Sequence, residues 1–175
     1  MKLIAGLGNP GQKYENSRHN VGRMVIEEIC RHPEFTGLRW ERLDGAEVCK
    51  VGDLILARAG EGSFMNESGT WLKKLRDFYK IANENVIVVY DDLDLEVGRV
   101  KMGSKGPQVH NGVNDVIEMM GEGWIHVRCG VDDRGGDRIL PGSDYVLGEF
   151  PDVLVRDKLV SNAVHQVLEL IGKGV

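Results

Sequence analysis

The feature that most constrains the fold is the uninterrupted apolar run Val86-Ile87-Val88-Val89-Tyr90, which Asp91 follows directly. A strand with no polar face is typical of the interior of a sheet, where both faces of the strand are buried. Asp91 would then lie where this strand ends, at the edge of the sheet where open α/β folds usually place their sites. The run therefore predicts both a central strand and the position of a site.

Strand-like and helix-like segments alternate along the rest of the chain, which indicates an α/β fold. The predicted strands cover residues 2–5, 47–51, 54–59, 86–90 and 126–131, with a hairpin at Gly52-Asp53. Helical spacing of apolar residues predicts helices over about 21–31, 71–79 (capped near Asn66 or Ser68), 111–120 and 151–171. The segment 132–143 is predicted to be a Gly- and Asp-rich loop. No repeat or linker interrupts this order, so we expect one domain over residues 1–175.

Composition narrows the class of protein. No apolar run approaches the roughly 20 residues that span a membrane, and no signal-peptide layout precedes Gly6, so we expect a cytoplasmic protein. Three widely spaced cysteines without a CxxC pair suggest neither a disulfide framework nor a zinc site. The net charge of −5 weakens the case for a nucleic-acid partner, although a local basic patch can exist on an acidic protein.

His19 and Asp91 are the candidates for acid–base chemistry. An imidazole near its ordinary pKa can remove a proton from water, and a carboxylate on its other nitrogen fixes the tautomer. Because His19 follows the first predicted strand and Asp91 follows the buried one, the two could meet at one edge of the sheet. The alternative is that His19 caps the following helix and Asp91 caps a turn, and the residues alone leave both readings open.

Three asparagines stand in turn-like motifs: Asn9 in GNPG, Asn66 in FMNESG and Asn111 in HNG. A neutral amide offers donors and an acceptor without adding charge, which suits a substrate with peptide groups. Asparagine before Gly or Pro is also an ordinary turn residue. Asn20 is interpreted as a turn residue only.

Two other kinds of site are less favoured. Gly6, Gly8 and Gly11 match the dinucleotide pattern GxGxxG, but the polar segment that follows does not open a helix. A carboxylate cluster suits a divalent cation, and its members here are Asp91, Asp92, Asp94, Asp132 and Asp133. Asp92 and Asp94 alternate with leucines as at a solvated strand end, so we predict no metal.

Basic residues gather in the second half of the chain, where they could hold phosphates or simply form a charged surface. They are Arg99, Lys101, Lys105, Arg128, Arg134 and Arg138.

Taken together, the motifs KLIAGLGNPGQKYENSRHNVG, FMNESG, VVYDDLDLEVG and HNG make the chain resemble the bacterial peptidyl-tRNA hydrolase family from Lys2 to about Gly148. The resemblance implies a single-domain α/β fold with a twisted mixed sheet flanked by helices. It also implies hydrolysis of the ester between a peptide and the terminal ribose of tRNA, which recycles tRNA. Neither metal nor cofactor is implied, and the family is usually monomeric.

The resemblance also implies roles for individual residues. His19 would activate water and Asp91 would orient His19. The substrate would be bound by Asn9, Tyr14, Phe64, Met65, Asn66 and Asn111. The tRNA phosphates would be held by Lys101, Lys105 and Arg128.

The segment before HNG is among the departures from the family pattern: Gly106-Pro107-Gln108-Val109 stands before His110-Asn111-Gly112, where the family usually reads GGHNG. A non-catalytic RNA- or protein-binding relative is therefore the alternative, and a nucleotide-dependent oxidoreductase is the third.

Overall fold

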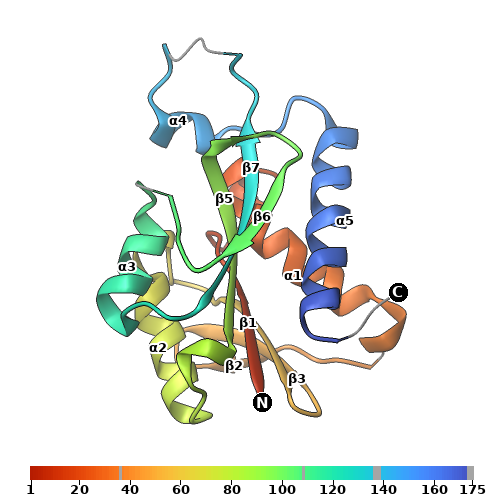
Figure 1. Ribbon diagram of the computed structural model, residues 1–175, viewed down its shortest axis with the longest axis vertical. Helices are drawn as coiled ribbons and strands as arrows, with labels where there is room; N and C mark the ends of the chain where they lie inside the picture. The colour runs from red at the N-terminus through yellow and green to blue at the C-terminus, as the bar shows by residue number, and fades with distance from the viewer. Residues whose placement is uncertain (36, 108, 136–138, 173–175) are drawn as a thin grey trace.

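A seven-stranded mixed sheet organises the protein in the computed structural model, which describes residues 1–35, 37–107, 109–135 and 139–172 (Figure 1). The strand order is β2-β3-β4-β1-β5-β7-β6. The strands are β1 (Lys2–Gly6), β2 (Glu41–Leu43), β3 (Ala46–Val51), β4 (Leu54–Ala59), β5 (Val86–Glu96), β6 (Val100–Gly103) and β7 (Ile125–Asp132). The central strands β4, β1, β5 and β7 run parallel, whereas β2, β3 and β6 join antiparallel. The predicted α/β class is confirmed.

Helices cover both faces of the sheet, as the apolar run requires. The helices are α1 (Val21–Arg31), α2 (Ser68–Phe78), α3 (Asn111–Met120), α4 (Gly142–Leu147) and α5 (Val153–Leu170). Ile87 and Val89 of β5 pack into a core with α1 and α5, and Val88 and Tyr90 pack into a second core with α2 and α3. Figure 1 shows α1 and α5 together on one side of the strands and α2 and α3 on the other.

Several predicted boundaries were wrong. Strand β5 continues to Glu96, and Asp92 is buried rather than solvated because it forms an ion pair with Arg128. Strand β6 was not predicted, and the end of the predicted loop 132–143 belongs to α4.

The N-cap of α2 is Glu67, whose own side chain makes no cap bond; the carboxylate of Asp115 on α3 instead accepts from the N–H groups of Gly69 and Thr70. The predicted start of the helix near Asn66 or Ser68 is confirmed, but the capping side chain comes from α3 and from neither of these residues. No helix among the described residues is long and apolar enough to cross a lipid bilayer.

Two glycines set the distance between α1 and the sheet. A Cβ on Gly6 would lie 2.2 Å from the carbonyl oxygen of Gly22, and a Cβ on Gly22 would lie 2.1 Å from that of Val89. Real Cβ atoms do not approach backbone so closely, so only hydrogen fits at both positions. The start of α1 is therefore held against the backbone of β5, two residues before Asp91.

Candidate functional site

Asp91 lies where β5 extends past its neighbour β1. The last residue of β1, Gly6, pairs with Val89, and the N–H of Leu7 still donates to the Val89 oxygen over 2.9 Å as the chain leaves the sheet. At Asp91 the partner on the other flank is Cys129 of β7. The sequence suggested that Asp91 lies at the end of a strand, but the structure places it inside β5. Because β1 pairs with β5 only as far as Val89, other elements can approach Asp91 on that side of the strand.

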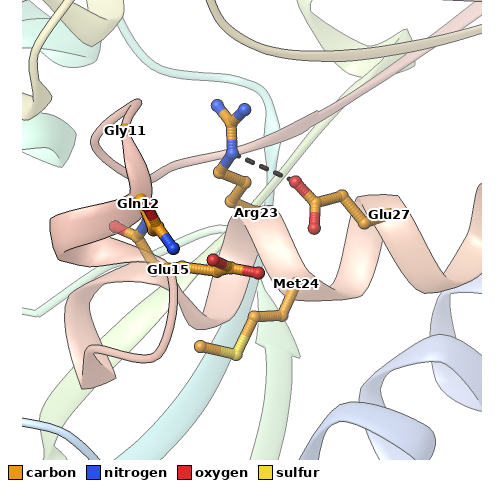
Figure 2. A pocket seen from close by; sticks show the side chains of 7 residues that line it. Gly11, Gln12, Glu15, Arg23, Met24 and Glu27 are labelled. Atoms are coloured by element: carbon orange, nitrogen blue, oxygen red, sulfur yellow. Dashed lines mark hydrogen bonds and ion pairs between the residues drawn. The ribbon is translucent and has the colours of Figure 1, made fainter.

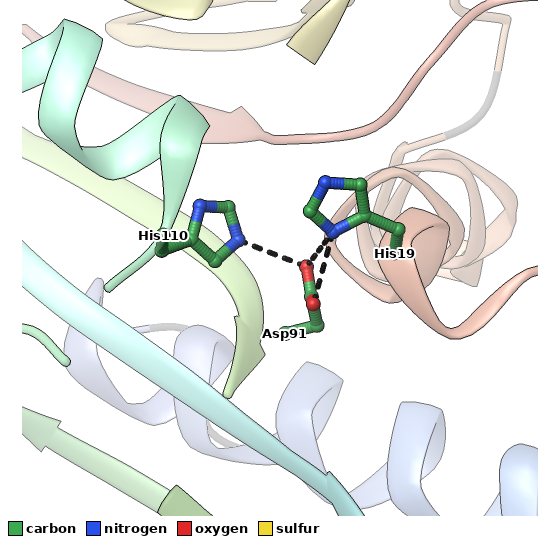
Figure 3. A group of neighbouring side chains, drawn as sticks. All are labelled: His19, Asp91 and His110. Atoms are coloured by element: carbon green, nitrogen blue, oxygen red, sulfur yellow. Dashed lines mark hydrogen bonds and ion pairs between the residues drawn. The ribbon is translucent and has the colours of Figure 1, made fainter. Parts of the chain in front are cut away.

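His19 approaches Asp91 from a single 3-10 turn, Arg18–Asn20, which leads directly into α1. Its Nδ1 lies 2.8 Å from Oδ1 and 3.0 Å from Oδ2 of Asp91 (Figure 3). The side chain of His19 is 12% exposed and that of Asp91 is 2% exposed. The alternative that His19 merely caps α1 was wrong, since the N-cap is Asn20 and no side chain caps that helix.

A second histidine, His110, completes the group, and sequence reasoning did not single it out. Its Nε2 lies 3.0 Å from Oδ1 of Asp91, and its Nδ1 accepts a hydrogen bond from the N–H of Val113 over 3.2 Å (Figure 3). Because Nδ1 accepts, Nε2 carries the proton and donates to Asp91. Its position before Asn111-Gly112, at the N-cap of a predicted helix, was the available signal.

The charges of this group fix the protonation states. Burial alone would raise the pKa of Asp91, but the two histidines and their hydrogen bonds hold it well below its usual range. Burial lowers the pKa of His19, yet the charge of Asp91 and its hydrogen bond outweigh burial and raise it above 6.5. Asp91 is therefore a carboxylate at neutral pH, and neutral His19 keeps its proton on Nδ1 and its lone pair on Nε2.

His19, Asp91 and His110 are also a set of residues that metals use, with ligand atoms within 4.8 Å of one another. A zinc ligand must offer a lone pair at about 2.0–2.2 Å from the ion. Here Nε2 of His110 is a donor, because its other nitrogen already accepts from a backbone amide. The arrangement is therefore that of a hydrogen-bonded trio.

Asn9 is held in place by Asn20, which its sequence context predicted to be a turn residue only. Oδ1 of Asn20 accepts from the N–H of Asn9 over 2.8 Å, and Nδ2 of Asn20 donates to the Asn9 oxygen over 2.9 Å. Oδ1 of Asn9 in turn accepts from the N–H of Met65 over 2.7 Å. These bonds join three segments beside the trio and orient the Asn9 amide.

A cleft of about 900 Å³ opens over this group and brings together all eight residues predicted for catalysis and substrate binding. Phe64 is 45% exposed, so an aromatic face is available at the cleft. One wall is apolar and comes from α4 and the residues before it. The predicted residues that line the cleft are Asn9, Tyr14, His19, Phe64, Met65, Asn66, Asp91 and Asn111; Leu140, Pro141, Val146 and Leu147 form the apolar wall.

The three predicted phosphate contacts lie outside the lining of the cleft as the structure describes it. Lys101 on β6 is exposed and pairs in register with Arg128 on β7, and Lys105 is exposed in the loop that follows β6. Nε of Arg128 bonds Asp92 over 2.5 Å, so this guanidinium is partly committed within the protein. Arg138 lies outside the described residues.

A smaller cavity of about 270 Å³ lies along the first turns of α1, lined by Gly11, Gln12, Glu15, Asn20, Arg23, Met24 and Glu27 (Figure 2). Arg23 is fully engaged there: it bonds Glu27 over 3.1 Å and the Ala59 oxygen over 2.7 Å. The ion pair between Arg23 and Glu27 therefore forms part of the wall of this cavity.

Comparison with known proteins identifies relatives across the whole chain. A family model described as peptidyl-tRNA hydrolase matches residues 3–175. Peptidyl-tRNA hydrolases of Campylobacter fetus and Caldanaerobacter subterraneus are both 41% identical, over 99% and 100% of this chain and 93% and 95% of those proteins. A crystal structure of peptidyl-tRNA hydrolase from Acinetobacter baumannii superposes with a TM-score of 0.81 at 26% identity, covering 98% of this chain and 87% of that one.

Proposed function

Because this chain belongs to the peptidyl-tRNA hydrolase family and hydrolyses peptidyl-tRNA, we propose that His19 is the general base of the reaction and Asp91 the group that orients it. The observation that carries the assignment is the 2.8 Å contact between His19 Nδ1 and the buried Asp91 carboxylate at the cleft. It leaves Nε2 of His19 as the basic atom.

The reaction follows from these protonation states. Nε2 of His19 takes a proton from water as the water oxygen bonds to the ester carbonyl carbon, which becomes a tetrahedral oxyanion. The imidazolium is stabilised by Asp91, whose low pKa keeps the proton on the histidine. When the bond to the ribose oxygen breaks, that oxygen receives the proton from Nε2. The products are the free peptide acid and tRNA, which returns to translation. A base of this kind contributes roughly 10²–10⁴ in rate.

The asparagines supply neutral donors for the same step. Since Oδ1 of Asn9 already accepts from Met65, its Nδ2 is the end left for substrate. Asn66 and Asn111, both exposed at the cleft, would bind peptide groups or the terminal adenosine, with Tyr14, Phe64 and Met65 providing contact area. One donor to an oxyanion is worth roughly 2.7–4 kcal/mol in the transition state.

The tRNA backbone would run over the edge formed by β6 and β7. Lys101 and Lys105 are exposed there, and Arg128 stands beside Lys101 in the register. Cations on one edge supply the attraction to phosphate that the net charge of −5 does not. We assign phosphate binding to these three residues together. We also propose that the protein acts as a monomer in the cytoplasm. A dimer mass in analytical ultracentrifugation would contradict the monomer.

Release of an N-blocked aminoacyl group from tRNA tests the function. The wild type should hydrolyse it, and His19→Ala should lower kcat by about 10²–10⁴ with little change in KM. His165→Ala is the matched control, because His165 is 54% exposed on α5 and pairs with Glu169. Folded wild type that binds tRNA without hydrolysis would instead indicate a non-catalytic relative. Full activity of His19→Ala would remove the base assignment alone.

A further inference from the structure

Arg18, the residue before His19, is a buried arginine that the reaction scheme does not use. It is 7% exposed, although an arginine is seldom buried without a specific task. Its Nε has no partner among the described residues, which leaves one buried donor unsatisfied. Such a cost is retained only where the rest of the side chain contributes something in return.

The guanidinium of Arg18 contacts Tyr145 of α4, the helix that carries Val146 and Leu147 of the apolar wall. It lies 4.0 Å from the ring centroid of Tyr145 and 5.8 Å from that of Phe150. It also donates to the backbone carbonyl oxygen of Tyr145, in the last turn of α4, over 3.4 Å. A planar cation stacked on an aromatic ring and bonded to the same residue holds it in one orientation.

Further contacts make the attachment rigid. The Arg18 guanidinium bonds Asp133 over 3.5 Å, and Asp133 in turn bonds the hydroxyl of Tyr145. The backbone N–H of Arg18 donates to the oxygen of Gly148 over 3.0 Å, and Ser17 forms a β-bridge with Glu149. Backbone and side chain of the turn that carries His19 are therefore both tied to the end of α4.

Other residues of α4 and of the segment before it line the cleft. Leu140 and Leu147 are 49% and 48% exposed, and both line the same cleft as His19. An apolar side chain bound there would remove these surfaces from water and hold α4 in place. Through Arg18, that restraint reaches the turn on which the base sits.

We propose that Arg18 is a positioning residue that links the apolar wall formed by Leu140 and α4 to His19, so that an apolar side chain next to the scissile ester increases turnover. The proposal rests on the proposed function and adds to it a preference among substrates. The preferred class is tRNA carrying a blocked apolar residue over one carrying blocked glycine.

The test compares kcat for N-blocked leucyl-tRNA and N-blocked glycyl-tRNA in the wild type and in Arg18→Lys. Lysine keeps the charge but loses the planar stack. The wild type should turn over the leucyl substrate several-fold faster, and Arg18→Lys should lower kcat for it by about tenfold while changing the glycyl value much less. Arg31→Lys, at an exposed arginine 70% accessible at the far end of α1, is the matched control.

A second variant changes the position of the Arg18 guanidinium without substituting Arg18 itself. A Cβ on Gly148 would lie 3.2 Å from a terminal nitrogen of Arg18, and the backbone there, with φ −74°, accepts alanine. Gly148→Ala should therefore displace the guanidinium slightly and reproduce part of the loss with the leucyl substrate.

The outcomes separate the two proposals. If both substrates lose rate equally, in step with the fall in Tm, Arg18 is only structural and the positioning proposal fails while the hydrolase assignment stands. The positioning proposal also fails if the wild type shows no preference for the leucyl substrate. Absence of hydrolysis of either substrate by folded wild type contradicts the proposed function itself.

Discussion

The imidazoles of His19, which is partly buried, and His126, which is buried on β7, both lie at the same sheet, yet their pKa values shift in opposite directions. Nδ1 of His126 faces the hydroxyl of Tyr90 over 2.7 Å, and its ring stacks on Trp124 at 3.6 Å. Burial and then the charge of Arg128 lower the pKa of His126 to about 4. Burial acts on His19 in the same direction, but Asp91 reverses the result. A proton acceptor for neutral pH is thus made by a carboxylate partner, and burial alone gives a histidine that stays neutral.

The largest effect should come from giving His19 an uncharged partner, as His126 has. Asp91→Asn removes the charge that raises the His19 pKa, and we expect kcat to fall by about 10²–10⁴ with KM nearly unchanged. Because neutral His19 is the active form, activity rises with pH through its pKa. The variant's acidic limb should therefore move to lower pH. Asp157→Asn on α5 is the control, and equal losses in kcat and substrate affinity would mean that Asp91 is structural.

His110→Asn sharpens the comparison at the carboxylate itself. Asparagine can still accept from the N–H of Val113 as an N-cap, but it does not reach Asp91. Losing one donor to the buried Asp91 carboxylate should lower kcat by about tenfold and Tm by a few degrees. Kinetics and thermal unfolding measured on one preparation check this. Unchanged kcat in a folded variant would show that a single histidine is sufficient to hold Asp91.

The third experiment measures how His126, the histidine without a carboxylate partner, affects the pH dependence of stability. The unfolded chain binds a proton to His126 near pH 6.5 and the folded chain only near 4, so stability should fall as pH drops from 6.5 to 4. His126→Asn keeps an acceptor for Tyr90 but does not titrate, and its urea midpoint should vary less over that range. Activity at neutral pH should stay within about threefold. A pH dependence as steep as that of the wild type would assign the acid sensitivity to other groups.

The smallest effect concerns the cations near His126. Lys101 is exposed, whereas its neighbour Arg128 is bonded to Asp92. Lys101→Gln should therefore weaken tRNA binding and reduce the slope of log affinity against log salt by about 1. Lys158→Gln on α5 is the control. An unchanged slope would remove Lys101 from the phosphate contacts.

The fold was predictable where pattern is local. The apolar run of β5, the hairpin at Gly52-Asp53 and the periodicity of α1 each specify an element from a few adjacent residues. The six-residue helix α4 is too short to show a helical period, and it was missed.

The site was predictable only in part, because burial depends on distant partners. The sequence around Asp92 predicts a solvated carboxylate, but in the structure Asp92 is paired with Arg128, which lies 36 positions away in the chain. The sequence around His110 predicts an Asn-Gly turn, but in the structure His110 is the N-cap of α3, and its ring points to Asp91. Asn20 reads as a turn residue until it bonds both backbone groups of Asn9.

The contact of Gly6 and Gly22 with their neighbours has a consequence for how this sequence can change over time. Any side chain at either position would push α1 away from the sheet, and with it the turn that carries His19. A displacement of about 1 Å at a reacting group can cost on the order of 10²-fold in rate. Natural selection on the catalytic rate would therefore remove substitutions at Gly6 and Gly22, even where the variant still folds and although neither position contacts the substrate.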